Sequence, residues 1–234
     1  MGGDWTVRAR TVVALARLLT AAVCLIALTH RLLWGLGSQT IAGENFFAYL
    51  TVQSNIALML LLIAAGIVAF RRATDPRWVT VGLALVLTWT ITAGIAFALI
   101  VWQAELHGIR MYVPWSDLLI HYWLPACTAL GWIVSPGHRR VPWVVVPISL
   151  VFPLVWGGFT MWRGTLIGWY PYYFLDLRQV SGFGEFAATS AIALAIFALI
   201  ASILVLISRI RPLHWQGVPR RALRRARALR ARGR

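Results

Sequence analysis

The 234-residue chain carries a run of hydrogen-bonding side chains at the start of a long apolar stretch that continues to Ile63. Thr51, Ser54 and Asn55 stand at positions i, i+3 and i+4, so they share one face of a helix, and Gln53 points elsewhere. Hydrocarbon offers no water, and an unpaired polar group in it costs roughly 1–3 kcal/mol. The protein must therefore satisfy these side chains internally or use them in its chemistry.

A carboxylate and an imidazole stand four residues apart in another apolar stretch, at Asp117 and His121. This spacing places them on one helix face, where the carboxylate would fix the tautomer of the imidazole. Pro125 lacks the N–H that would bond the carbonyl of His121, so the helix is weakened at the histidine. An ionisable residue at membrane depth is by default a hypothesis for function. The alternative is a histidine that is paired only for packing.

Together, these residue types have the chemistry to cleave an ester. A threonine hydroxyl is a poor nucleophile unless a base lies within about 2.6–3.2 Å and is itself oriented by a third group. Thr51, His121 and Asp117 would supply the nucleophile, the base and the orienting group. Ser54 or Asn55 would donate hydrogen bonds to the oxyanion. The alternative for each polar residue taken alone is an interhelical hydrogen bond, worth ~0.6 kcal/mol on average.

The elements that must position these side chains are transmembrane helices. Sixty per cent of the residues are apolar and the mean hydropathy is +0.75, whereas soluble domains are ~45–50% apolar. A span needs about 20 apolar residues. The predicted fold class is therefore all-α, a polytopic membrane bundle that forms one domain over residues 1–210. Its six transmembrane helices are predicted near residues 11–29, 46–70, 78–102, 116–134, 142–162 and 183–208.

The placement of arginine predicts the orientation of the bundle. The chain has a net charge of +15 and no lysine, and most arginines fall on one side of the six-span arrangement, with the acidic residues biased to the other. Both termini are therefore expected to be cytoplasmic, in a multi-pass protein of the bacterial inner membrane. Residues 211–234 are predicted to be a disordered, arginine-rich cytoplasmic tail that binds anionic lipid headgroups rather than nucleic acid.

Depth in the membrane connects the two polar segments. Thr51 and His121 each lie five residues beyond the outer start of an inward-running span, so both sit roughly 7–8 Å below the outer boundary. The segment Trp169–Phe174 is too aromatic for an ordinary solvated loop and is expected to cover this level of the bundle. Three of its side chains are expected to shape an apolar acyl pocket, namely Tyr170, Tyr172 and Phe174.

No metal or organic cofactor is expected from the sequence. Cys24 and Cys127 both fall in predicted spans and are interpreted as small apolar core residues. The sequence contains no CxxC, haem or zinc-ligand spacing. The ester chemistry described above requires no such group.

Three segments carry a family resemblance: Phe47–Asn55, His121–Pro125 and Trp169–Asp176. Over roughly residues 10–210, they resemble the actinobacterial six-span membrane proteins of the Pr-six-Pr family. More distantly, the chain is similar to the eukaryotic androgen-induced and androgen-dependent membrane proteins. That family is described as intramembrane threonine hydrolases acting on fatty acid esters of hydroxy fatty acids. The resemblance implies Thr51 as the nucleophile and His121 as the histidine, although the spacing from histidine to proline is one residue shorter here.

The sequence thus predicts an integral membrane hydrolase that cleaves a lipid or fatty-acid ester near the outer leaflet. Its partners would be membrane lipids and a hydrophobic ester substrate. One alternative is a non-enzymatic lipid-sensing or regulatory membrane protein that uses the same polar pocket for binding. A further alternative is a transporter with His121 and Asp117 as a proton relay, against which the lack of a visible internal repeat weighs.

Overall fold

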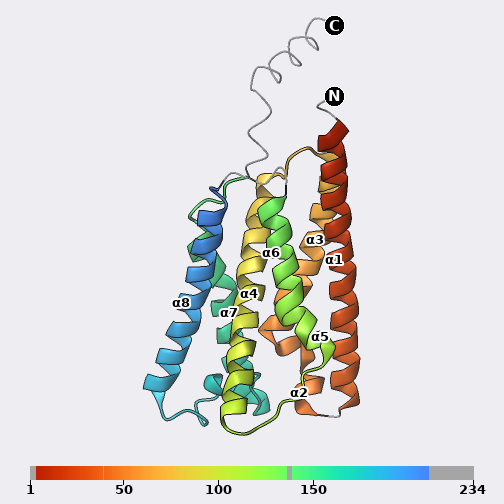
Figure 1. Cartoon of the computed structure of the whole chain (residues 1–234). Coiled ribbons are helices and arrows are strands. Elements are labelled where there is room, and N and C mark those ends of the chain that lie inside the picture. The colour runs from red at the N-terminus through yellow and green to blue at the C-terminus, as the bar shows by residue number, and fades with distance from the viewer. Residues whose placement is uncertain (1–3, 39, 136–138, 211–234) are drawn as a thin grey trace, which may run out of the picture.

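The computed structural model describes residues 4–38, 40–135 and 139–210, and every regular element within them is helical (Figure 1). In chain order these elements are α1 (Asp4–Gly37), α2 (Ile41–Glu44), η1 (Phe46–Ala48), α3 (Leu50–Arg71), α4 (Arg77–Leu106), α5 (Trp115–Leu118), η2 (Leu119–Trp123), α6 (Leu124–Val134), α7 (Val145–Ile167), η3 (Tyr173–Leu175) and α8 (Phe183–Ile207). The predicted tail, residues 211–234, lies outside the described residues.

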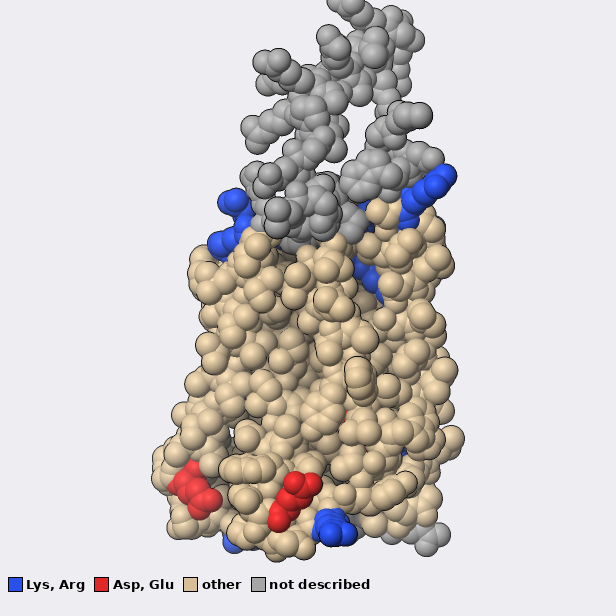
Figure 2. Space-filling view, in the orientation of Figure 1, with Lys and Arg blue, Asp and Glu red and all other residues tan. Residues whose placement is uncertain are grey.

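Six helical stretches are long and apolar enough to cross a membrane, which confirms the predicted all-α fold with six transmembrane helices. They are Arg8–Gly37, Leu50–Arg71, Arg77–Leu106, Trp115–Val134, Val145–Ile167 and Phe183–Ile207. Figure 2 shows, on one face, a broad band in which almost no charged side chain reaches the surface. Such a band is the surface that hydrocarbon requires.

The first helix is much longer than predicted. It has 34 residues, so at 1.5 Å per residue it is about 50 Å long, against a hydrocarbon core of ~30 Å. His30, Arg31 and Trp34 lower the hydropathy of its last turns, but none of them breaks a helix. The helix therefore continues beyond the apolar stretch and carries Arg31 into the region of the candidate site.

Helix α4 lies at the centre of the bundle. It packs against α3, α6, α7 and α8, while α1 packs along α3. The core between these helices includes the fully buried side chains of Leu58, Leu83 and Leu87. This packing fixes the rotation of α3 and α4, and hence the direction in which their polar residues point.

The fourth span is not one continuous α-helix. Its middle, η2, is π-helical, and the N–H of Leu124 bonds the carbonyl of Leu119, five residues back. Pro125 removes one backbone donor, and a π-helical turn accommodates that loss by widening the helix. The predicted weak point at His121 is therefore real, because the histidine lies within this segment.

The described start of α1 and the described end of α8 lie at the same end of the bundle (Figure 1). At the opposite end, here called the far end, lie α2, η1 and the loop that contains η3. Thr51 lies in the first turn of α3 at this far end, and α5 leads into η2, which contains His121, there. The two polar segments singled out in the sequence therefore meet at the same end of the molecule.

Candidate functional site

The far end contains a cavity of about 260 Å³ between α1, α3, α4 and the fourth span. Polar side chains from four different segments line it, among them Arg31, Thr51, Asp117, His121 and Tyr172. Its remaining walls are mainly apolar, including Phe46, Val52 and Phe97. All three residues predicted as catalytic thus face one cavity.

Thr51 lies in the first turn of α3, where a backbone N–H has no acceptor within the helix. The side chain and backbone of Thr51 both hydrogen-bond the Tyr172 phenol, and both bonds act to lower its pKa. Burial outweighs these bonds and raises the pKa of Tyr172 to about 12. Tyr172 therefore stays protonated at neutral pH and covers the threonine.

His121 is held in one tautomer by a backbone group. Its Nδ1 lies 2.9 Å from the carbonyl oxygen of Asp117. A carbonyl can only accept, so Nδ1 carries the proton and Nε2 has the free lone pair. The ring stacks on Phe97, with 3.9 Å between centroids and 12° between planes. The ring therefore has a fixed orientation, and in its neutral form Nε2 is the basic nitrogen.

The carboxylate of Asp117 is directed away from His121. It accepts a hydrogen bond of 2.8 Å from Nε of Arg31, whose guanidinium also lies over the ring of Trp34. The sequence predicted that this carboxylate would orient the imidazole, but in the structure the backbone carbonyl of the same residue accepts that hydrogen bond. The carboxylate instead pairs with Arg31, and both residues line the cavity.

Two polar residues beside the cavity were not singled out as site residues from the sequence. Arg31 lines the cavity directly, and His30 places its Nδ1 3.1 Å from the hydroxyl of Ser116, at the start of the fourth span. The signal was the pair of basic residues near the end of the first apolar stretch.

Thr51 and His121 line the same cavity, but they are not hydrogen-bonded to each other in the described structure as a nucleophile and its base would be. Within the part of the chain that the structure describes, no hydrogen bond joins the Thr51 hydroxyl to the His121 ring. Thr51 is bonded to Tyr172 instead. A ligand in the cavity would lie between the two catalytic candidates.

Ser54 and Asn55 face a different direction from the cavity. Both are fully buried, and both donate to the carbonyl of Thr51, over 3.0 Å and 2.9 Å respectively. Asn55 also donates to the carbonyl of Ile120, over 3.2 Å. The asparagine therefore ties α3 to the fourth span one residue before His121, and neither residue is among those that line the cavity.

Of the three aromatic residues expected to shape a pocket, Tyr172 is the one that lines the cavity. Phe174 stacks on its ring, with 5.6 Å between centroids. Tyr170 lies directly over Gly164 in α7, where any Cβ would collide with its ring. These two side chains therefore support the wall of the cavity from behind.

The aromatic loop contains a compact local ion pair. Hydrogen bonds from Arg178 and Gln179 hold the pKa of the Asp176 carboxyl well below its usual range. The Arg178 guanidinium donates from Nε to that carboxylate over 2.9 Å and lies over the ring of Tyr170. This pairing stabilises the local fold of the segment that follows η3.

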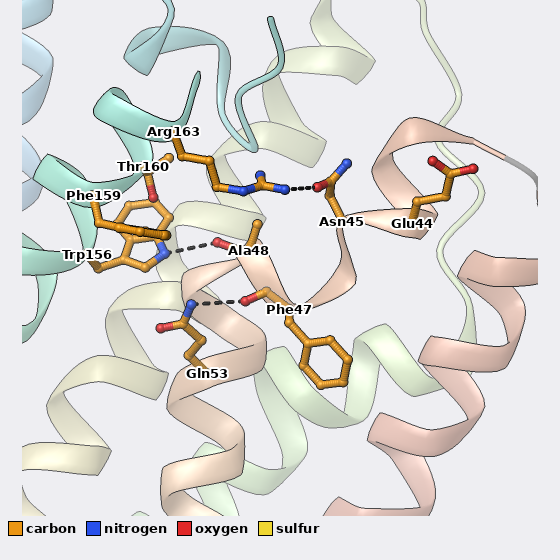
Figure 3. Close-up of a pocket in the computed structure, with 9 residues that line it drawn as sticks. All are labelled: Glu44, Asn45, Phe47, Ala48, Gln53, Trp156, Phe159, Thr160 and Arg163. Atoms are coloured by element: carbon orange, nitrogen blue, oxygen red, sulfur yellow. Dashed lines mark hydrogen bonds between the residues drawn. The ribbon is translucent and has the colours of Figure 1, made fainter. Parts of the chain in front are cut away.

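A second far-end cavity, of about 250 Å³, lies beside η1 (Figure 3). Its polar groups hold the backbone that leads into α3. Trp156 donates to the carbonyl of Ala48 and Gln53 to the carbonyl of Phe47, each over 2.9 Å, and Arg163 bonds Asn45. Gln53 thus points away from Thr51 as expected, and it bonds the turn before its own helix rather than a neighbouring one.

The described residues include no group of three or more histidine, cysteine or acidic side chains that could hold a metal ion. Comparison of the chain with known protein families, with curated proteins and with solved structures finds no match.

Proposed function

We propose that this protein is an integral membrane hydrolase that cleaves a lipid or fatty-acid ester, with Thr51 as the nucleophile and His121 as the base. The observation that carries the proposal is the His121 tautomer. Nδ1 is committed to the Asp117 carbonyl, which leaves a basic Nε2 on a ring that lines the same cavity as Thr51. A nucleophile, an available base and an apolar wall in one cavity are what acyl transfer requires.

The first half-reaction would transfer the acyl group to Thr51. Its hydroxyl oxygen attacks the ester carbonyl, and Nε2 of His121 takes the hydroxyl proton. The ester C–O bond then breaks and the same proton passes to the leaving alkoxide, so that an alcohol departs and an acyl-threonine remains. For this step the Thr51 hydroxyl has to turn from Tyr172 towards His121.

The second half-reaction would regenerate the enzyme. Nε2 of His121 removes a proton from water, the hydroxide attacks the acyl-threonine, and the proton returns to Thr51 as the carboxylic acid leaves. The phenol of Tyr172 and the guanidinium of Arg31 both line the cavity and are the groups available to stabilise the oxyanion. Ser54 and Asn55 would instead hold the carbonyl of Thr51 and keep the first turn of α3 in place.

The test is covalent labelling of the purified full chain with a serine/threonine-reactive fluorophosphonate, together with turnover of a series of long-chain esters. We expect labelling of the wild type, its loss in Thr51→Ala and partial retention in Thr51→Ser. We also expect a fall of ~10²–10⁴-fold in labelling rate in His121→Ala, which removes the general base.

Thr88→Ala is the matched control, because Thr88 is a fully buried threonine whose hydroxyl donates to the carbonyl of Ala84 in its own helix. Its labelling should equal that of the wild type. Labelling that persists in both Thr51→Ala and His121→Ala would overturn the mechanism.

The second candidate is a non-enzymatic lipid-sensing protein, favoured by the bond between Thr51 and Tyr172. In that case the cavity would bind a lipid without turning it over. Saturable binding of an intact ester to the wild type, with neither turnover nor phosphonate labelling, would decide for this candidate.

A further inference from the structure

The cavity lined by Thr51 and His121, here called the Thr51 cavity, reaches the surface of the bundle along α4. Three further lining residues follow one another towards the far end, from Ala96 through Ile100 to Met111 in the connection to α5. Ala96 is exposed, Ile100 is half-buried and Met111 is 42% exposed. These residues mark an opening of the cavity along α4, here called the α4 slot.

The α4 slot faces hydrocarbon at its deep end. Gly94 meets the carbonyl of His121, so α4 and the fourth span are level at this residue. Ala96 stands two positions further on, a rise of about 3 Å. Leu99 shares the face of Ala96 at i+3, is 50% exposed and is not among the residues that line the cavity. Ala96 therefore lies where the lipid-facing surface of α4 meets the cavity, at the depth of the proposed base.

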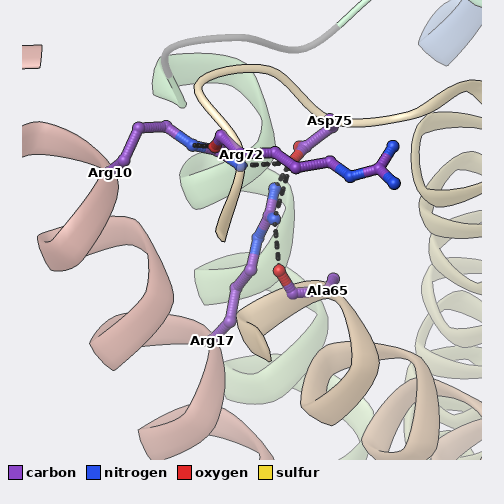
Figure 4. A network of polar contacts seen from close by, with 5 residues as sticks. All are labelled: Arg10, Arg17, Ala65, Arg72 and Asp75. Carbon is purple, nitrogen blue, oxygen red and sulfur yellow. Dashed lines mark hydrogen bonds and ion pairs between the residues drawn. The ribbon is translucent and has the colours of Figure 1, made fainter. Parts of the chain in front are cut away.

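The wall of the cavity that α1 forms is held by ion pairs near both ends of the helix. At the end of the described termini, Arg10 and Arg17 share the buried carboxylate of Asp75, in the turn between α3 and α4 (Figure 4). At the far end, Arg31 pairs with Asp117 over 2.8 Å. Breaking a buried ion pair such as that of Asp75 is strongly destabilising. We therefore expect α1 to stay in place, which makes the α4 slot, rather than the α1 wall, the entrance for a ligand.

The depth of Thr51 matches that of the ester bonds of a glycerolipid. Thr51 and Arg71 stand at the two ends of α3, 20 positions apart, which is about 30 Å along the helix. The hydrocarbon core is also ~30 Å thick. With Arg71 at one boundary of the hydrocarbon, Thr51 lies at the other, where esters join the acyl chains of a leaflet to its headgroups. An ester in the middle of an acyl chain would lie deeper.

The Thr51 cavity is too small to enclose a membrane lipid. Its volume is about 260 Å³, whereas sites that bury most of a drug-sized ligand have roughly 300–1,000 Å³. A lipid with two acyl chains is larger than such a ligand, so most of it has to stay outside the cavity. The α4 slot allows this, because it opens to hydrocarbon at Ala96.

We propose, on the basis of the hydrolase function proposed above, that the substrate is a diacyl glycerolipid of the leaflet that meets the far end, and that it enters through the α4 slot. One acyl ester would lie between Thr51 and His121, with its acyl chain passing Ala96 into the hydrocarbon and its headgroup near Met111. The Thr51 oxygen bonds the acyl carbon, the bond from that carbon to the glycerol oxygen breaks, and this oxygen takes the proton from His121. A lysolipid leaves, and water then releases the chain from Thr51 as a fatty acid.

The first test measures lipid entry and needs no catalysis. The purified full chain is placed in phosphatidylglycerol vesicles that contain a small fraction of the same lipid with a diazirine on one acyl chain. The residues labelled on irradiation are mapped by mass spectrometry. Ala96→Trp blocks the deep end of the α4 slot. Ala98→Trp is the matched control, because Ala98 is exposed on the same helix and does not line the cavity.

Val52 reports entry, because it lines the cavity and is only 4% exposed. We expect labelling of Val52 in the wild type and in Ala98→Trp, and its loss in Ala96→Trp. Ile192 in α8 is 61% exposed and should be labelled equally in all three, as a measure of ordinary lipid contact. Val52 labelling that is absent from the wild type, or equal in Ala96→Trp, would overturn the proposed entrance.

Turnover tests the substrate class separately. We expect the wild type and Ala98→Trp to release fatty acid from dihexadecanoyl phosphatidylglycerol and Ala96→Trp to lose this activity, while a short, water-soluble fluorophosphonate labels all three alike. Labelling of Val52 by the diazirine lipid without turnover of any ester would overturn the hydrolase and not the entrance. Turnover of a short soluble ester without labelling of Val52 would overturn the entrance and not the hydrolase. Faster turnover of a hexadecanoyl ester of a hydroxy fatty acid than of phosphatidylglycerol would overturn the assignment of a glycerolipid.

Discussion

At the scale of single residues, the backbone and the side chain of one residue make different contacts in the site. Asp117 bonds His121 through its backbone carbonyl and Arg31 through its carboxylate. A substitution to asparagine would therefore leave the His121 tautomer in place, because every residue type other than proline keeps the same backbone groups. A substitution of Asp117 thus tests the role of its hydrogen bond with Arg31 and not the tautomer of the His121 imidazole.

Tyr172 is expected to make the stability of the folded protein depend on pH. Burial raises the pKa of its phenol to about 12, from the ordinary value near 10. A phenol whose pKa is higher in the folded protein stabilises that state fully below about pH 10, and this stability is lost as the pH rises towards 12. The loss at the alkaline limit is about 2–3 kcal/mol.

The prediction is that the wild type loses more stability between pH 10 and 12 than Tyr172→Phe does. Chemical denaturation followed at several alkaline pH values measures this difference. Ultraviolet titration should also show the most alkaline phenolate transition of the wild type disappearing in the variant. Parallel stability curves over this range would contradict the assignment.

At the scale of elements, the π-helical segment η2 and helix α4 position His121 together. The carbonyl of His121 faces Gly94 so closely that a Cβ there would lie 2.2 Å from its oxygen. Glycine is the one residue that permits this approach, which explains why a helix breaker is tolerated in the middle of a long span.

We therefore expect Gly94→Ala to push η2 away from α4. Overpacking of this kind costs ~1–3 kcal/mol, and the displaced imidazole should lower the rate of fluorophosphonate labelling. Thermal unfolding in detergent and the labelling rate are the two measurements. Gly158→Ala, where the added Cβ meets open space, is the control and should leave both unchanged. Equal stability of the two variants would contradict the close contact.

At the scale of the whole molecule, the two ends of the bundle carry different polar groups. The far end holds the cavity with Thr51 and His121, and the end of the described termini holds the arginine cluster around Asp75. Arg71, Arg72 and Arg77 flank the α3–α4 turn at the latter end. If arginine-rich ends stay in the cytoplasm, the Thr51 cavity belongs to the outer leaflet.

Reporter fusions test this orientation. Green fluorescent protein fused after residue 234 should fluoresce in a bacterial host, and alkaline phosphatase fused at the same point should be inactive. Insertion of the phosphatase after Gly108, in the α4–α5 connection, is the matched control and should be active. An active C-terminal phosphatase fusion would place the Thr51 cavity on the cytoplasmic side.

Much of the architecture could be predicted from the sequence because crossing a membrane is a local property. About 20 apolar residues suffice to define a span, and the six predicted segments all correspond to helices. The ends were less certain, since a residue such as Arg31 lowers hydropathy without ending a helix. Candidate residues Thr51 and His121 were also local signals, as polar groups in apolar stretches.

The partners of those residues were decided only by the tertiary structure. Arg31 and Asp117 are 86 positions apart, and Thr51 meets Tyr172 from a loop between the last two spans. Such pairs depend on how each helix is rotated about its axis, which is set by packing between helices and, at His121, by the wider π-helical turn. Spacing along the chain states which residues share a face. It does not state what that face meets, and here that difference turned the Asp117 carboxylate from the imidazole to the arginine.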